Sequence, residues 1–296
     1  MDSYIRTDLA SESREGILAD AGELQGVSLS QRSEGSVTVS HICICDENAE
    51  KILQKPKGDY ITLSFSPIAQ MDQEQRRHLS DLISKEILGL LSALVPHAGR
   101  GFVAGLGNRR ITADALGPWT VDRITVTNHL QTLDPTLFSA LGQRSVAALA
   151  PGVLGDTGVE AAKLIAKAVE AVSPDAVIVV DALAARSVER LGRTVQISNA
   201  GISPGSGVGN RRMALNQETL GVPVIAVGVP TVVHSATLVR DALSKAGIEQ
   251  VYPELETVLQ NGEGFFVTSK DCDEMLKDFS QILAMSLDTA LALDAV

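Results

Sequence analysis

A series of unbroken apolar runs constrains the fold of this chain more than any other feature. The runs are Gly101–Leu106, Val146–Ala150, Ala176–Val180 and Val222–Val229. Continuous apolar runs are typical of strands covered on both faces, whereas half-exposed strands alternate apolar and polar residues. Helical stretches and loops containing Gly, Pro or Asp separate the runs, which is the pattern of βαβ units. The sequence therefore predicts an α/β fold whose largely parallel sheet is flanked by helices.

Two segments ahead of these runs are predicted to be strands. Ser36–Cys45 and Tyr60–Phe65 are rich in β-branched residues, which favours strands. From Asp72 onward, apolar residues recur at i, i+3 and i+4 until Pro96 interrupts the pattern, which predicts a helix with one buried face. A second stripe of this kind begins near Lys270 and predicts the last helix.

Two threonines are candidate helix caps. Thr157-x-x-Glu160 has the form of a capping box ahead of an alanine-rich helical stretch. Thr231 follows an apolar run and is predicted to cap a helix that extends to Ala246.

Composition excludes some classes of function. The chain has 296 residues and carries 25 Lys and Arg against 36 Asp and Glu, a formal net charge of −11. Nucleic-acid binders need a basic face to neutralise phosphates, so direct binding of nucleic acid is disfavoured. Residues 1–35 are polar without periodicity and are predicted to form a mobile N-terminal arm. Residues 36–296 are long enough for a single α/β domain.

The cysteines favour a reducing compartment. There are 3 of them, Cys43, Cys45 and Cys272, which is not a disulfide framework. The beginning of the chain has no basic and apolar signal segment, and no apolar run is suited to span a membrane, so a cytoplasmic protein is expected. His41, Cys43 and Cys45 alternate along one strand, but without a second Cys/His pair a buried edge of the core is favoured over a zinc site.

Two aspartates are the first candidates for chemistry. Ligands of open α/β sheets bind beyond the carboxyl ends of the strands. Asp181 directly follows Ala176–Val180, and Asp114 lies in the loop after the run that ends at Leu106. Two carboxylates a few ångströms apart share a proton, so the pair can activate water and protonate a leaving group. The alternative is that Asp114 caps a helix and Asp181 a turn, and the residues alone favour it.

A glycine-rich stretch, Ser198–Arg212, is the second candidate. It lacks the spacing of a Walker loop and of G-x-G-x-x-G, which disfavours nucleotide binding, and no cofactor is predicted. Gly201-Ile-Ser203-Pro-Gly205 matches G-x-S-x-G, but a nucleophile elbow leads into a helix and this segment leads into further glycines. A flexible loop over the rim of the sheet, suited to gating a substrate, is therefore favoured over a serine hydrolase.

Several blocks of the chain form a recognisable set. They are Gly105-Leu-Gly-Asn108, Thr112-Ala-Asp-Ala-Leu-Gly-Pro118, Pro151-Gly-Val, Val180-Asp-Ala-Leu-Ala-Ala-Arg-Ser187, Gln196-Ile-Ser198, Pro204-Gly-Ser-Gly-Val-Gly-Asn210 and Thr219-Leu-Gly-Val-Pro-Val-Ile-Ala-Val-Gly-Val-Pro-Thr-Val-Val233. Taken together, these blocks resemble a known family, the germination proteases of spore-forming Firmicutes, endopeptidases that degrade small acid-soluble spore proteins. They follow the family's order over nearly the whole chain. The chain departs from the family in a shorter segment ahead of its last helix.

The resemblance implies a fold similar to that of hydrogenase maturation proteases and catalysis by Asp114 and Asp181, which fall on the family's motifs. It also implies a zymogen that removes its own N-terminal peptide by cleavage between Asp8 and Leu9, inside Tyr4–Glu12. Its substrates would be small acid-soluble spore proteins, its assembly a homotetramer, and its location the cytoplasm of the developing spore and the spore core. The arm is then expected to occupy the active groove as a pseudo-substrate.

Two other hypotheses remain open. In the first, Asp114 and Asp181 hold a cation and the enzyme is a metal-dependent peptidase. In the second, the chain binds spore proteins without cutting them. Sensitivity to a chelator separates the first from a metal-free peptidase, and substitution of either aspartate separates the second.

Overall fold

The computed structural model describes residues 7–21, 24–142, 144–205, 213–248, 252–261 and 265–292. The start of the predicted self-processing segment, residues 4–6, and most of the glycine-rich stretch, residues 206–212, lie outside the described residues. No helix of the described part is long and apolar enough to cross a membrane.

One sheet organises the described residues, and it contains nine strands. They are β1 (Val27–Glu34), β2 (Val37–Ile44), β3 (Gly58–Ser64), β4 (Arg100–Gly105), β5 (Ser145–Leu149), β6 (Ala176–Ala185), β7 (Thr194–Ser198), β8 (Val224–His234) and β9 (Phe266–Val267). The order is β1-β2-β3-β7-β8-β6-β4-β5, with β9 added to β8. The α/β class is confirmed. Only β5, β4, β6 and β8 pair in parallel, however, and the other pairings are antiparallel. The sheet is therefore mixed.

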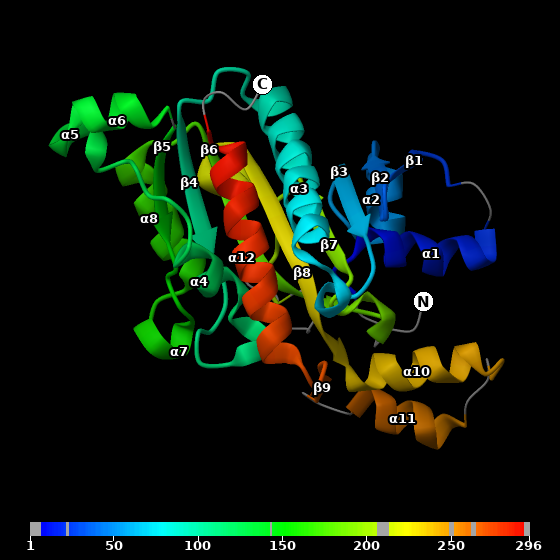
Figure 1. Cartoon of the computed structure of the whole chain (residues 1–296). Coiled ribbons are helices and arrows are strands. Elements are labelled where there is room, and N and C mark those ends of the chain that lie inside the picture. The colour runs from blue at the N-terminus through cyan, green and yellow to red at the C-terminus, as the bar shows by residue number, and fades with distance from the viewer. Residues whose placement is uncertain are drawn as a thin grey trace.

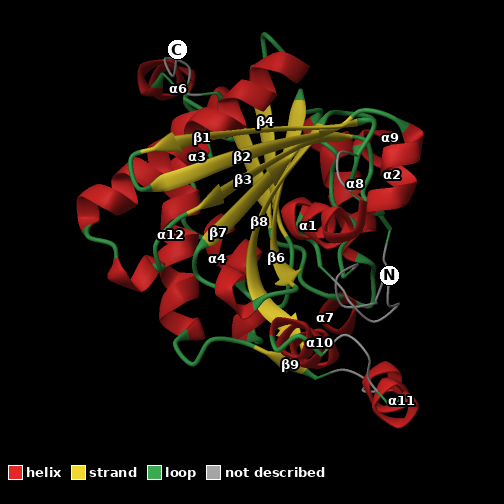
Figure 2. Ribbon diagram, turned by 90° about the vertical axis from the view of Figure 1, so that its right-hand side faces the viewer, coloured by secondary structure: helices red, strands yellow, loops and turns green. Residues whose placement is uncertain are grey.

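Helices cover both faces of the sheet. The longer ones are α1 (Ala10–Ala21), α3 (Gln73–Leu94), α8 (Ala161–Val172), α10 (Ser235–Lys245) and α12 (Cys272–Ala290). The shorter ones are α2 (Glu47–Leu53), α4 (Leu116–Val121), α5 (Leu130–Leu133), α6 (Pro135–Leu141), α7 (Leu154–Thr157), α9 (Gln217–Leu220) and α11 (Pro253–Asn261), and the 3₁₀ turns are η1 (Ile68–Gln70), η2 (Thr112–Asp114) and η3 (Val188–Arg190). Figures 1 and 2 show α3, α4 and α12 on one side of the sheet and α1, α2 and α8 on the other.

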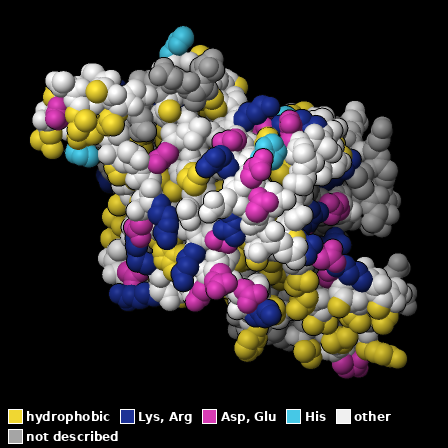
Figure 3. Space-filling view, viewed as in Figure 1, with side chains coloured by type: hydrophobic (Ala, Val, Ile, Leu, Met, Phe, Trp, Pro, Cys, Tyr) yellow, Lys and Arg dark blue, Asp and Glu magenta, His cyan; other side chains and the backbone are white. Residues whose placement is uncertain are grey.

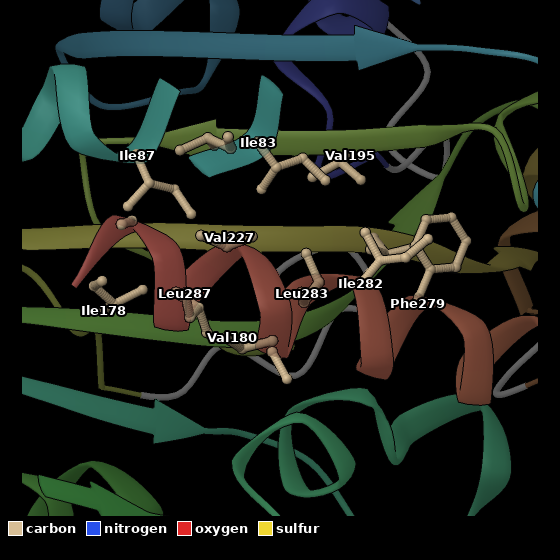
Figure 4. Packing of buried hydrophobic residues seen from close by; sticks show 14 of the residues in the cluster. Ile83, Ile87, Ile178, Val180, Val195, Val227, Phe279, Ile282, Leu283 and Leu287 are labelled. Atoms are coloured by element: carbon tan, nitrogen blue, oxygen red, sulfur yellow. The ribbon is translucent and has the colours of Figure 1, made fainter. Parts of the chain in front are cut away.

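The larger hydrophobic core lies on the side of α3 and α12. Figure 4 shows Ile83 of α3 and Leu283 of α12 converging with Val180 and Val227 of the central strands. The predicted helices are confirmed here. Asp72 caps α3 through a complete capping box, and the apolar stripe of α12 is buried. Burial of apolar side chains on this scale is the main source of stability in a domain of this size.

The opposite face carries smaller cores. Ile165 of α8 packs with Val177 and Val179 of β6 in one cluster, while Ile42 and Tyr60 pack with α2 in another. Between these clusters the sheet is covered by the N-terminal segment, because Ala10 joins the α2 cluster and Leu9 forms a cluster of its own with β6 and β8. The sheet face between α8 and α2 is therefore occupied by the chain's own beginning.

The N-terminal residues are more ordered than the sequence suggested. The segment predicted to be a mobile arm contains α1 and β1, and β1 pairs with β2 along its full length. Its polar side chains hid the strand, because β1 is an edge strand with mostly exposed side chains. Edge strands satisfy only one row of backbone groups and need few apolar residues.

Two predicted caps were wrong. Thr157 ends α7, and α8 begins after Glu160, whose carboxylate accepts a hydrogen bond from the Met213 amide instead of capping the helix. Thr231 lies inside β8, which continues to His234, and His234 caps α10 through its Nδ1 atom. The strand extends because its last residues pair with the end of β6 and with β9.

The surface carries two clusters of exposed apolar side chains and, elsewhere, the neighbouring thiols of Cys43 and Cys45. Figure 3 shows apolar side chains over α10 and α11 and over α5 and α6, where Tyr252 and Leu133 are among the most exposed. The expected buried edge at His41, Cys43 and Cys45 was wrong, because His41 binds Asp59 at 2.7 Å and Cys45 is exposed.

Candidate active site

Asp181 lies in a row of residues that crosses the central strands. It pairs with Gly228 of β8, which in turn pairs with Gln196 of β7. Residues directly opposite each other in a sheet present their side chains to the same face. Asp181 and Gln196 therefore face the same side, and the glycine between them places no side chain there. Both are buried, at 7% and 8% exposed.

Asp181 lies on β6 between a part of the strand that α8 covers and a part that Leu9 covers. On the same face, Val177 and Val179 pack against α8, whereas Leu183 and Ala185 pack against Leu9. Asp181 falls between the two clusters. The apolar run predicts Asp181 just after the strand, but β6 continues four residues beyond it, to Ala185. This extension pairs with β8 on one side and with the N-terminal segment on the other.

Asp114 is folded back onto the end of the neighbouring strand. The Leu106 amide donates to the Val180 carbonyl at 2.8 Å, which prolongs β4 alongside β6 up to the residue before Asp181. The chain then turns at Gly107, whose φ of 116° favours glycine. The Asn108 amide donates to Oδ2 of Asp114 at 2.8 Å. Since neighbouring strands lie about 4.8 Å apart, Asp114 and Asp181 share one rim of the sheet.

Close backbone packing holds this rim together. A side chain at Gly117 of α4 would meet the Val180 carbonyl oxygen at 2.6 Å, so only glycine lets α4 approach the ends of β4 and β6. The Thr231 hydroxyl donates to the Ala113 carbonyl at 2.7 Å and ties η2 to β8. The motif blocks around residues 105–118 and 180–187 are thus brought together by backbone contacts.

Asp8 and Leu9 lie directly against β6. The Asp8 amide donates to the Ala184 carbonyl at 2.8 Å, and the Ala184 amide donates to the Asp8 carboxylate at 2.9 Å. Leu9 is completely buried, where it contacts Leu183, Ala185 and Val233. The segment therefore lies against β6 beyond the point where β4 has ended.

Gln196 holds the backbone on both sides of Leu9. Its Nε2 donates to the Asp8 carbonyl oxygen at 3.1 Å, and its Oε1 accepts from the Ala10 amide at 2.8 Å. A side-chain amide has one donor and one acceptor end, so this pairing satisfies both. Because Gln196 stands in the same row as Asp181, the peptide between Asp8 and Leu9 is held over the row that contains the carboxylate.

Glu12 anchors the far end of the same segment. Its carboxylate accepts hydrogen bonds from the Arg186 amide at 2.7 Å and the Ser187 amide at 3.0 Å, and Arg190 lies 3.8 Å away. Only 3% of Glu12 is exposed. Burial raises the pKa of this carboxyl group, while the amide donors and Arg190 act in the opposite direction.

The site contains residues that the sequence did not single out as functional. Asp114, Asp181, Asp8 and Leu9 were candidates from the motifs, and the structure places all four around the end of β6. Gln196 and Glu12 were missed, although both stood inside blocks that carry the family resemblance. Their contribution depends on pairing between β7 and β8 and on the docked segment, which periodicity does not reveal.

Other sequence candidates lie elsewhere or lack the needed geometry. Ser203 lies in the loop after β7, next to Ile202, which forms a bridge with Leu215. The residues into which a nucleophile elbow would lead, 206–212, lie outside the described residues. Within the residues that the structure describes, no group of three or more His, Cys, Asp or Glu side chains is arranged to hold a metal ion. The aspartate pair alone would offer a cation two protein carboxylates.

Comparison with known proteins gives the family to which this chain belongs. The germination protease family model matches residues 6–246. Germination protease of Clostridium tetani is 38% identical, with 97% of this chain and 95% of that protein covered. The Caldanaerobacter subterraneus subsp. tengcongensis protein is 40% identical (97% and 94% covered), and that of Priestia megaterium 42% (81% and 66%). This chain belongs to the germination protease family.

Among solved structures, the chain matches a NiFe hydrogenase maturation protease, HycI, from Thermococcus kodakarensis. The match has a TM-score of 0.37 and 17% sequence identity, and it covers 67% of this chain and 98% of that one.

Proposed function

We propose that this chain is a self-processing endopeptidase that cuts its own Asp8–Leu9 bond and then hydrolyses small acid-soluble spore proteins, with Asp114 and Asp181 as the catalytic pair. The observation that carries the proposal is the docked segment, because the Asp8 carbonyl is bound by Gln196 in the row that contains Asp181. Residues 1–35 form the arm with the propeptide in this proposal, and residues 36–296 the catalytic domain.

The reaction requires one carboxylate to accept a proton from water and the other to hold one. The water oxygen bonds to the Asp8 carbonyl carbon while its proton passes to the ionised aspartate. The resulting intermediate collapses, the bond from that carbon to the Leu9 nitrogen breaks, and the nitrogen receives a proton from the protonated aspartate. Such pairs operate because two nearby carboxylates do not ionise together readily. No covalent enzyme intermediate is formed.

The docked segment also supports the zymogen part of the proposal. A substrate cannot occupy the edge of β6 while Asp8 fills it with two hydrogen bonds to Ala184. Removal of residues 1–8 eliminates those bonds and frees the edge for a new strand. By family resemblance, the active form is a homotetramer in the developing spore and the spore core.

The proposal is tested by following the intact mass of the full chain at mildly acidic and neutral pH. Wild-type protein is expected to lose residues 1–8, and Asp114→Asn and Asp181→Asn are expected to slow that loss at least about a thousandfold. Asp122→Asn is the matched control, because Asp122 binds Arg109 on the surface. Each processed sample is then given a small acid-soluble spore protein.

Three outcomes separate the hypotheses. Processing of both aspartate variants at the wild-type rate would contradict the catalytic assignment. Loss of wild-type processing in the presence of a chelator, with recovery on adding a divalent cation, would favour the metal-dependent peptidase. A wild-type chain that cuts neither itself nor the spore protein would contradict the endopeptidase proposal and favour a binding role.

A further inference from the structure

We propose that Gln196 is a catalytic residue, the donor that stabilises the oxyanion formed when the scissile carbonyl is attacked. This inference rests on the proposed function, because it takes the Asp8–Leu9 bond as the bond that is cut. Its basis is the contact of Gln196 Nε2 with the carbonyl oxygen of Asp8 at 3.1 Å.

The chemistry of the reaction requires such a donor. When the water oxygen bonds to the Asp8 carbonyl carbon, the carbonyl π electrons move onto its oxygen, which becomes negatively charged. When the intermediate collapses, these electrons re-form the double bond and the Leu9 nitrogen departs with a proton from the acidic aspartate. Hydrogen-bond donors fixed in advance at an oxyanion stabilise the transition state more than the ground state, and loss of one donor typically costs about 10²–10³ in rate.

The fold fixes Gln196 in advance of the reaction. Its backbone lies in β7, which is paired on both sides, with Thr62 of β3 and with Gly228 of β8. Its side chain is 8% exposed, so little water competes for the amide. The side chain can reach across β8 because residue 228 is a glycine, and a Cβ atom there would meet the Leu183 side chain at 2.5 Å.

The Oε1 end of the Gln196 amide sets the orientation of its Nε2 end. Oε1 of Gln196 accepts from the Ala10 amide at 2.8 Å, so Nε2 must point toward the Asp8 carbonyl. In this arrangement Gln196 binds the carbonyl of the residue before the scissile bond, Asp8, and the amide of the second residue after it, Ala10. The bound polypeptide contributes only backbone atoms to this contact, so the contact serves any substrate sequence that adopts the same extended path.

The two ends of the amide can be tested separately with variants of the full-length chain. Gln196→Glu keeps an acceptor for Ala10 but replaces the donor by a carboxylate that repels the oxyanion. Gln196→Met is of similar size and removes both ends. Gln217→Glu is the matched control, since it adds the same charge on the exposed first turn of α9. The self-processing rate is measured by intact mass, and docking of the segment by amide exchange at Ala10.

Gln196→Glu is expected to process about 10²–10³ times more slowly than wild type at neutral pH, with exchange at Ala10 unchanged. Its rate relative to wild type is expected to recover as the pH falls toward the pKa of a carboxylic acid, because a protonated glutamic acid regains an O–H donor. A merely structural role would not give this recovery. Gln196→Met is expected to be slow at every pH and to exchange faster at Ala10.

The inference is overturned if Gln196→Glu processes within about threefold of wild type at neutral pH, or if its defect does not diminish in acid. Asp181→Asn, run in parallel, separates this failure from failure of the proposed function. If Asp181→Asn is inactive while Gln196→Glu is normal, the aspartate mechanism stands and the oxyanion role falls. If Asp181→Asn processes normally, the proposed function itself is contradicted.

Discussion

The two faces of the sheet are held by different forces. On the face of α3 and α12, contact is mainly apolar, and Phe65 and Phe279 lie with their ring centroids 6.1 Å apart in one extended core. On the opposite face, the N-terminal segment is bound through backbone groups, one amide side chain and one buried carboxylate, with Leu9 as its main apolar anchor. The apolar core joins many elements, so cutting one peptide bond does not separate them. The N-terminal segment is held by a few hydrogen bonds, so cutting one peptide bond can release it.

The largest effect on stability is expected on the face of α12. Phe279→Ala removes a fully buried ring and is expected to lower the free energy of unfolding by about 3–5 kcal/mol. Met285→Ala in the same helix is the control, since Met285 is 43% exposed. Urea denaturation measures both. Equal losses for the two variants would contradict the assignment of the main core to this face.

Leu9→Ala is expected to release the segment without unfolding the domain. Truncation of a buried leucine costs about 2–5 kcal/mol, so the Ala10 amide is expected to exchange at least about thirtyfold faster. The midpoint of global unfolding should change little, because the cluster of Leu9 is separate from the main core. Leu29→Ala, at an exposed position of β1, is the control. A loss of global stability comparable to that of Phe279→Ala would show that the two faces are not independent.

Glu12→Ala is expected to loosen the end of the segment by a smaller amount. It leaves the amides of Arg186 and Ser187 without their acceptor, at a cost of about 1–3 kcal/mol. Exchange at these two amides should rise about tenfold, which mass spectrometry of peptic fragments can follow. Glu15→Ala is the control, because Glu15 is more exposed and also pairs with Arg190. If both variants behave alike, the buried carboxylate is not the anchor.

The smallest expected effect is on the reactivity of a thiol, that of Cys43, which lies on the α3 side of β2. Cys43 follows Val37 and Val39 on the same side of β2 but is only half-buried. A hydrogen bond with Cys45, and then burial, raise the pKa of Cys43 to about 11 from 9.0. Alkylation at neutral pH should therefore be roughly a hundredfold slower than for an ordinary thiol and should rise about tenfold per pH unit up to pH ~10.

Cys45→Ala removes that hydrogen bond and is expected to speed alkylation of Cys43, measured by mass spectrometry of the modified peptide. The thiolate is the reactive form, so a lower pKa means more thiolate at a given pH. A rate that is independent of pH, or unchanged by the substitution, would contradict the role assigned to Cys45.

The sequence was sufficient for the apolar framework and insufficient for the site. Continuous runs and helical stripes predicted β4, β5, β6, β8, α3 and α12, because burial on both faces or on one stripe leaves a periodic signature. The order of strands was not predictable, since β7 is placed between β3 and β8 by pairing between distant segments. That insertion makes the sheet mixed.

The same limit applies to the site residues. Asp114 and Asp181 were identified as candidates because each follows an apolar run, whereas Gln196 and Glu12 act through partners more than a hundred residues away in the chain. Residues 7–12 were wrongly expected to be mobile, because the groups that hold them, Gln196 and the amides of Arg186 and Ser187, belong to distant segments of the chain. Polar contacts between distant segments leave no periodic pattern of residues from which they could be predicted.

The proposed function depends on one statement, that the protein cuts the Asp8–Leu9 bond, whose carbonyl Gln196 binds from the row that contains Asp181. Sequencing the new amino terminus of the processed wild-type chain, together with the mass of the released peptide, tests it most directly. We expect a chain that begins at Leu9 and a peptide that ends at Asp8. A new amino terminus at any other residue would contradict the account, because the docked segment would then not be the substrate.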